Sequence, residues 1–183
     1  MKFIKCGCLG IAMSIVGCAY HPAPYQVVDS LPYKRGYMSG FYKEGVTEEV
    51  VKAEHYYKIT VQLDNGSSKA RAKNMLLYHT AKLAQANGVS AFSIKKINNS
   101  VRCGYSRVGD KKPYIADSGS TASAFITLIQ PTTPEEMLAR PTYQAAEMIA
   151  QYEHNVLQGE SKAEAAINRK ANEEECRARF NNS

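Results

Sequence analysis

The stretch that decides the fold is residues 57–88, YKITVQLDNGSSKARAKNMLLYHTAKLAQANG. Its first seven residues alternate apolar and polar side chains, which is typical of a strand with one buried face and one wet face. Asp64–Gly66 then turns the chain. Ser67 or Ser68 can cap a helix that ends near Gly88, which permits a left-handed stop. The sequence therefore predicts a strand, a turn and a long helix.

The predicted helix carries one broad apolar face, and its basic side chains lie mostly around that face on a 100° wheel. The apolar positions are Ala72, Leu76, Leu77, Thr80, Leu83 and Ala84, and the basic ones are Lys69, Arg71, Lys73 and Lys82. Such a helix is expected to pack on a sheet.

Three more strands are expected after this helix. The first two, 89–97 and 101–108, flank a turn at Asn98-Asn99-Ser100. Residues 109–119 contain Gly and Pro breaks that are typical of a loop, and the strongly apolar stretch 121–130 completes the set.

Two further helices are expected. Thr142 can cap the first, whose apolar stripe of Ala145, Ile149, Tyr152 and Val156 should cover the sheet. From Glu160 the composition changes to Ala, Glu, Lys and Arg, with acidic residues four positions before basic ones, which is typical of a solvated helix. The alternative for this last helix is a docking surface for another protein.

Together these elements predict an α+β fold: a small antiparallel-type sheet of about four strands, two packed helices and a polar C-terminal helix. The domain is expected to span residues 33–158, followed by a polar helical extension at 159–183.

The beginning of the chain has the features of an export signal. Lys2 and Lys5 precede an uncharged apolar run that is too short to cross a membrane, and the run ends in Ile15-Val16-Gly17-Cys18. These four residues resemble a bacterial lipobox, in which the cysteine is acylated and the leader is cut before it. We therefore expect a signal peptide at residues 1–17 and lipid attachment at Cys18.

The residues after Cys18 contain two prolines and no apolar period, so 18–32 is expected to be an extended tether, with ordered structure from about Tyr33. Ala19, rather than Asp, after the cysteine is compatible with sorting to an outer membrane. The expected location is the bacterial cell envelope, on the outer membrane facing the periplasm.

The number and distribution of charged residues argue against a nucleic-acid partner and exclude few other classes of function. Loss of residues 1–17 takes the 23 basic residues to 21, against 17 acidic ones. Basic residues are spread out and do not alternate with aromatic residues in a nucleic-acid motif. The small excess is ordinary for solubility.

Two cysteines, Cys103 and Cys176, remain after cleavage and acylation, in a compartment that favours oxidation. Two readings stay open, a disulfide that closes a long loop and two unpaired thiols, because spacing does not show proximity.

The core elements resemble a known family. Gly36-Tyr37, the strand from Tyr57, the helix containing LLYHTAKL at 76–83, and Phe92 soon after Gly88 are similar to a small, largely uncharacterised family of bacterial envelope lipoproteins. Its members have a lipobox leader, a Pro-containing tether and a strand-helix-Gly-strand core. The resemblance covers residues 33–152 and implies an envelope lipoprotein with a small α+β domain, without an assigned activity.

No catalytic, metal or cofactor signature emerges. His21, His55, His79 and His154 are scattered, and His79 is expected to be packed or half-exposed on the flank of the long helix. The serines near Gly66 and Gly119 are interpreted as turn and cap residues, since neither forms a nucleophile elbow.

The tyrosine content is the remaining bias, with 12 Tyr and no Trp. A cluster suits either a binding surface for protein or glycan, or the packing of a small domain. The candidate surface residues are Tyr33, Tyr37, Tyr42, Tyr56 and Tyr57.

We therefore expect a membrane-anchored, noncatalytic accessory or interaction lipoprotein. Its partners are the bilayer, through acylated Cys18, and an envelope protein. The alternatives are a periplasmic small-ligand-binding protein or enzyme, and a subunit of a larger envelope complex docked through the C-terminal helix.

Overall fold

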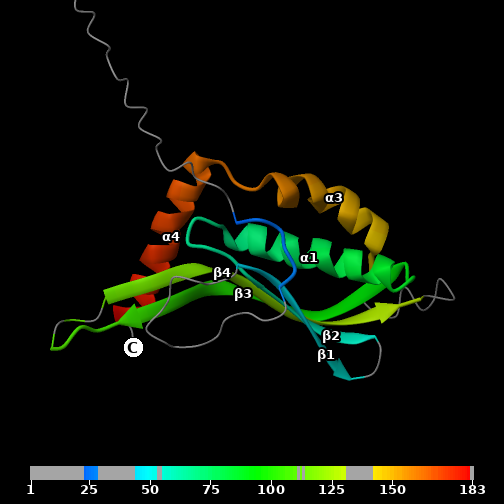
Figure 1. Ribbon diagram of the computed structural model, residues 1–183, viewed down its shortest axis with the longest axis horizontal. Helices are drawn as coiled ribbons and strands as arrows, with labels where there is room; N and C mark the ends of the chain where they lie inside the picture. Colours follow the sequence, from blue (N-terminus) through cyan, green and yellow to red (C-terminus); the bar gives the residue numbers. More distant parts are fainter. Residues whose placement is uncertain are drawn as a thin grey trace, which may run out of the picture.

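The computed structural model describes residues 23–28, 44–52, 55–110, 112, 114–130 and 142–181. Its elements are, in chain order, β1 (Gly45–Lys52), β2 (Tyr56–Gln62), α1 (Lys69–Ala86), β3 (Ala91–Ser106), β4 (Tyr114–Ile129), β5 (Thr142–Gln144), α3 (Ala145–Gln158) and α4 (Lys162–Asn181). The strands form one sheet in the order β1-β2-β4-β3-β5, and neighbours are antiparallel. The predicted α+β class with a C-terminal helix is confirmed (Figure 1).

The helix α1 begins and ends as its sequence indicates. Ser68 is the cap, since its side-chain oxygen accepts a hydrogen bond from the Arg71 backbone N–H at 3.0 Å. Gly88 takes a φ of 70°, a left-handed conformation that favours glycine. Ordinary local signals therefore determine both ends of this helix.

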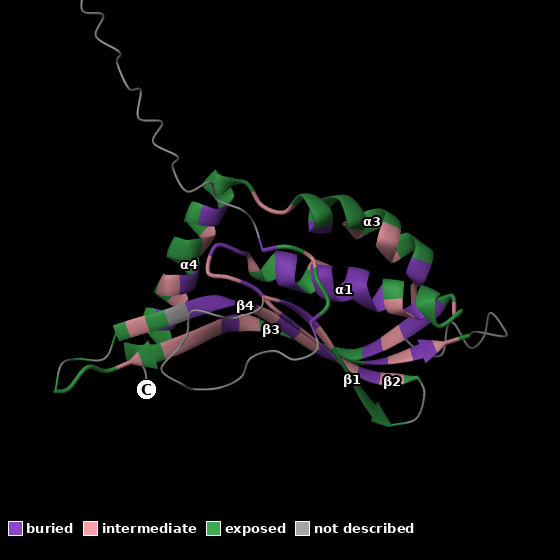
Figure 2. Ribbon diagram, in the orientation of Figure 1, coloured by how far each residue is buried: buried purple, intermediate pink, exposed green. Residues whose placement is uncertain are grey.

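The helix α3 was expected to cover the sheet, and this is wrong. It packs mainly on α1, on the side away from the sheet, and its main contact with the sheet is at β5 (Figure 1). The reason is that α1 is buried on several sides, with Arg71, Tyr78 and His79 covered as well as its sheet-facing residues (Figure 2). The second helix therefore forms a third layer. Thr142 lies in β5 rather than at the cap, which is Gln144.

The strands β3 and β4 are longer than predicted. The turn expected at residues 98–100 is wrong, because Asn98, Asn99 and Ser100 pair with Ser123, Ala122 and Thr121 of β4. The expected loop at 109–119 is shorter, since β4 begins at Tyr114. Cross-strand pairing overrides the turn preference of these polar residues, and a register shift between Ile94 and Ile97 absorbs the irregularity. The result is a long two-stranded ribbon that extends beyond the rest of the sheet.

Residues 23–28, hereafter the N-terminal strap, belong to the domain and not to an extended tether. Val28 donates its N–H to the Val46 carbonyl at 2.8 Å, and Val46 donates to the Gln26 carbonyl at 2.9 Å. Gly45 permits this approach, because a Cβ there would lie 2.6 Å from the Gln26 oxygen. The expectation that ordered structure begins only at about Tyr33 is therefore wrong for the strap. The sequence of the strap has no apolar periodicity from which its packing could be predicted.

The helix α4 is polar, as predicted, but it is not a loose extension. Cys176 forms a disulfide with Cys103 of β3. Asn172 donates to the carbonyls of Asn65 and Ser67 at 2.9 and 3.1 Å, and Arg179 donates to that of Val101 at 2.9 Å. The disulfide and the Arg179 bond hold α4 on β3, and the Asn172 bonds hold it on the turn between β2 and α1. In the described part of the chain, each helix is too short or too polar to span a bilayer.

Candidate binding groove between α4 and the β3–β4 ribbon

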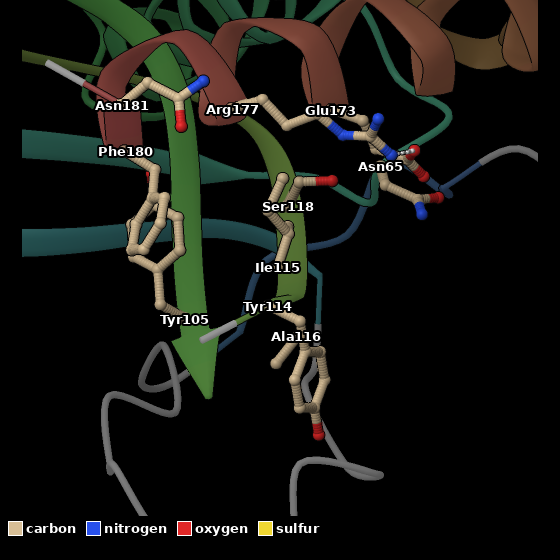
Figure 3. Close-up of a pocket in the computed structure, with 10 residues that line it drawn as sticks. All are labelled: Asn65, Tyr105, Tyr114, Ile115, Ala116, Ser118, Glu173, Arg177, Phe180 and Asn181. Atoms are coloured by element: carbon tan, nitrogen blue, oxygen red, sulfur yellow. Dashed lines mark ion pairs between the residues drawn. The ribbon is translucent and has the colours of Figure 1, made fainter. Parts of the chain in front are cut away.

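A groove of about 530 Å³ lies where the last turns of α4 cross the β3–β4 ribbon (Figure 3). It is bounded by the helix on one side and by β4 on the other. The residues that line it are Asn65, Tyr105, Tyr114, Ile115, Ala116, Ser118, Glu173, Arg177, Phe180 and Asn181.

One end of the groove is aromatic. The rings of Tyr105 and Phe180 lie side by side with centroids 5.1 Å apart, yet they remain 41% and 38% exposed. The Tyr105 hydroxyl donates to the Cys176 carbonyl at 2.7 Å, which holds the ring in place. Tyr114 adds a further exposed ring on β4. These rings offer rigid apolar area, which is the usual property of a binding surface.

The other end is charged. Arg177 Nη2 lies 3.8 Å from Glu173 Oε2, one helical turn earlier; the Arg177 side chain is largely in solvent and that of Glu173 is partly exposed. Such an exposed pair contributes only about 0–1 kcal/mol. The Arg177 guanidinium is therefore accessible to a carboxylate on a bound molecule. The groove is suited to a ligand with one apolar and one anionic part.

At the floor of the groove, the backbone of β4 at Gly119 lies very close to the backbone at Leu63. A Cβ at this position would lie 2.2 Å from the Leu63 carbonyl oxygen, so only glycine lets the chain after β2 cross β4 here. That crossing places Asn65 at the groove and leads into α1. The disulfide and this crossing together fix the two walls relative to each other.

The tyrosine surface predicted from the sequence is not a single surface. Tyr57 is 8% exposed and packs inside, whereas Tyr56 stacks on Phe125, with ring centroids 5.9 Å apart. Neighbours in a strand point to opposite faces of the sheet, so these two side chains separate. The other three candidates, Tyr33, Tyr37 and Tyr42, lie outside the described residues, as does Cys18.

The residues that do gather at the groove were missed. Period-two alternation places Cys103 and Tyr105 on the same face of β3, which is the one signal that pointed toward α4. That alternation points to α4 only once Cys103 is known to be bonded to Cys176.

A second cluster surrounds His79, which is 3% exposed and therefore packed. Its Nδ1 lies 2.9 Å from the Tyr25 hydroxyl, and its Nε2 lies 2.8 Å from Glu48 Oε1. The imidazole holds the pKa of Glu48 below its usual range, against the opposing effect of partial burial. Burial, with Tyr78 and Glu48 nearby, raises the pKa of Tyr25 to about 12.

This cluster fastens the strap to α1 and β1. Tyr25 is more strongly protonated than usual, which makes it a poor nucleophile or base. Among the described residues, no group of three His, Cys, Asp or Glu side chains could hold a metal ion. The polar atoms of this cluster already bind one another, so the groove is the stronger candidate for a functional site.

Comparisons of the chain with protein-family models, with curated proteins and with solved structures found no match. The resemblance to envelope lipoproteins stays a prediction that depends on the residues quoted for it.

Proposed function

We propose that this protein is a lipid-anchored lipoprotein of the bacterial envelope that acts by binding a partner rather than by catalysis. The observation that carries the proposal is Ile15-Val16-Gly17-Cys18 at the end of a Lys-flanked apolar leader. The disulfide between Cys103 and Cys176 supports it, because structural disulfides persist in exported proteins and are rare in the cytosol.

The groove is the proposed contact site for the partner. It combines the exposed rings of Tyr105 and Phe180 with the accessible guanidinium of Arg177. Aromatic and Arg side chains dominate the energy of protein interfaces. This supports a role as an accessory protein in envelope assembly or maintenance.

One observation favours the alternative of a small-ligand-binding protein. The groove volume of about 530 Å³ falls within the range usual for small-molecule sites, about 300–1,000 Å³. A ligand with an apolar ring and a carboxylate would match its two ends.

Docking through α4 could be tested by deleting residues 160–183, but point variants give a clearer result. Deletion would remove Cys176 and uncover the β3–β4 ribbon, so a lost partner could reflect misfolding. Point variants on the two sides of the helix avoid this problem. Phe180 lies in the groove, while Ile167 is 69% exposed elsewhere on α4.

The anchor is tested by the mass of the mature protein taken from membranes, beside a Cys18→Ser variant. An acylated N-terminal peptide that begins at Cys18, and that is lost in the variant, is expected. An intact leader without lipid would contradict the proposal.

Binding is tested with a photo-crosslinking amino acid at Phe180 and, as the matched control, at Ile167. Phe180 should give a discrete adduct in membranes that Arg177→Glu weakens. Adducts from Ile167 alone would instead support docking through the outer face of α4.

A further inference from the structure

The first residue of the strap is held at a buried junction. Arg71 Nη2 donates to the Ala23 carbonyl at 2.7 Å, and its Nη1 donates to the Asn155 carbonyl at the end of α3 at 3.0 Å. Arg71 Nε lies 3.7 Å from Glu160 Oε2, just before α4. Ala23 is therefore fixed where the start of α1, the end of α3 and the start of α4 meet.

Glu160 completes this junction. Its Oε1 accepts hydrogen bonds from the Ser68 backbone N–H at 2.8 Å and from Asn168 Nδ2 at 3.2 Å. Arg71 and Glu160 are both mostly buried, at 5% and 13% side-chain exposure. Removing either charge would leave the other buried without its ion-pair partner, which is strongly destabilising. The junction is a rigid attachment point.

The rest of the strap is fastened along its length. Tyr25 contacts His79 through its hydroxyl, and its ring meets the Tyr78 ring edge-on with centroids 5.1 Å apart. Gln26 Nε2 donates to the Glu44 carbonyl at 2.6 Å. The strap is therefore part of the domain from Ala23 onward and adds no length to the tether.

The distance from the anchor follows from the sequence. Only residues 19–22 separate Cys18 from Ala23. A fully extended chain spans at most about 3.3–3.6 Å per residue, so Ala23 lies within about 18 Å of an acylated Cys18. A tether that reached residue 33 would have allowed about 50 Å.

Resting on the proposed lipid anchor, we propose that the bilayer surface is the partner of the face around this junction, and that the domain stands on the membrane with its groove pointing away. The face includes Pro24, Leu157, Ser161 and Lys162, all exposed or partly exposed. The apolar side chains of Pro24 and Leu157 and the Lys162 ammonium group suit the headgroup region of a bilayer with anionic lipid.

The helix α4 sets the height of the groove. It begins beside the junction at Lys162 and ends at Asn181 in the groove wall (Figure 1). Its 20 residues span about 30 Å at 1.5 Å per residue. The short tether holds the junction close to the membrane, and the rigid helix α4 holds the groove away from it. The groove therefore faces partners in the periplasm.

The test uses the acylated full-length protein in vesicles of phosphatidylethanolamine and phosphatidylglycerol that carry a headgroup quencher. Single fluorophores are attached at Ser161→Cys, near the junction, and at Val108→Cys, at the tip of the β3–β4 ribbon. The native Cys103 and Cys176 stay in their disulfide. Quenching at 161 should be at least about twofold stronger than at 108, because the two sites differ in reach from the anchor.

The matched control inserts ten Gly and Ser residues between Cys18 and Ala23, which leaves Arg71 and the strap untouched. Quenching at 161 should fall toward the value at 108. Equal quenching at the two sites in the parent protein, or no change on insertion, would overturn the inference.

The mass of the N-terminal peptide is measured on the same samples, and this measurement separates the two proposals. An unacylated Cys18 refutes the proposed function. An acylated Cys18 with equal quenching refutes only the orientation.

Discussion

Cys103 of β3 and Cys176 of α4 are 73 residues apart in sequence, yet their Cα atoms lie 5.6 Å apart and the two are joined in a disulfide. The bond closes a long loop that contains β4, β5 and α3. It thereby fixes the last helix on the ribbon whose other residues line the groove.

The first prediction concerns this bond. The Cys103→Ser, Cys176→Ser double variant should lose about 4 kcal/mol of unfolding free energy, since a loop of this length is less constrained in the unfolded state. Denaturant titration measures the loss. Amides of α4 should also exchange faster, while those of α1 keep their protection. Equal stability of the two proteins would show that other contacts hold α4.

The second prediction concerns Gly119. An alanine in a strand normally stabilises relative to glycine, but here its Cβ would meet the Leu63 carbonyl at 2.2 Å. Gly119→Ala should therefore destabilise by about 1–3 kcal/mol. Ser123→Ala, on the same strand, is the control and should stay within about 0.5 kcal/mol of the parent protein. A stabilising Gly119→Ala would contradict the described crossing.

The third prediction concerns the strap at alkaline pH. The folded-state pKa of Tyr25 is raised from 10.0 to about 12, so its contribution is complete below pH 10 and is lost as the pH rises toward 12. The difference in unfolding free energy between the parent protein and Tyr25→Phe should shrink over this range. Using the difference cancels the titration of other tyrosines and lysines. A constant difference from pH 8 to 12 would be evidence against it.

The fourth prediction concerns the contact between Glu48 and His79. The pKa of Glu48 is lowered from 4.5, chiefly by the His79 side chain, so the carboxylate stabilises the fold above pH 4.5. That stabilisation should disappear as the pH falls further. Glu48→Gln should be less stable than the parent at pH 7, and the two should converge in acid. Urea titrations at several pH values provide the measurement, and parallel curves would rule out the linkage.

The contrast between residues 76–83 and 98–100 shows where sequence reasoning succeeds. The apolar face of α1 repeats every three to four residues, and that period exists only in a helix. Asn98-Asn99-Ser100 have strong turn preferences, yet they lie in the middle of β3 because β4 pairs with them. A turn preference of a few tenths of a kcal/mol is outweighed by several backbone hydrogen bonds between paired strands.

The candidate site was less predictable than the fold. Tyr56 and Tyr57 were grouped because they adjoin in sequence, although strand geometry separates them. Tyr105, Arg177 and Phe180 come together only because α4 returns to the ribbon across more than 70 residues. No local pattern encodes such a return.

The sequence by itself determined β2, the helix α1 with its caps and the polar character of α4, because these depend on neighbours within a few residues. It also carries the predicted lipid site at Cys18, which is a property of a linear motif. The tertiary structure alone decided that Cys103 meets Cys176, that Ala23 is held by Arg71, and that a groove opens beside Arg177. These features need segments far apart in the chain to bury surface together, and the free energy of that burial depends on the complete fold.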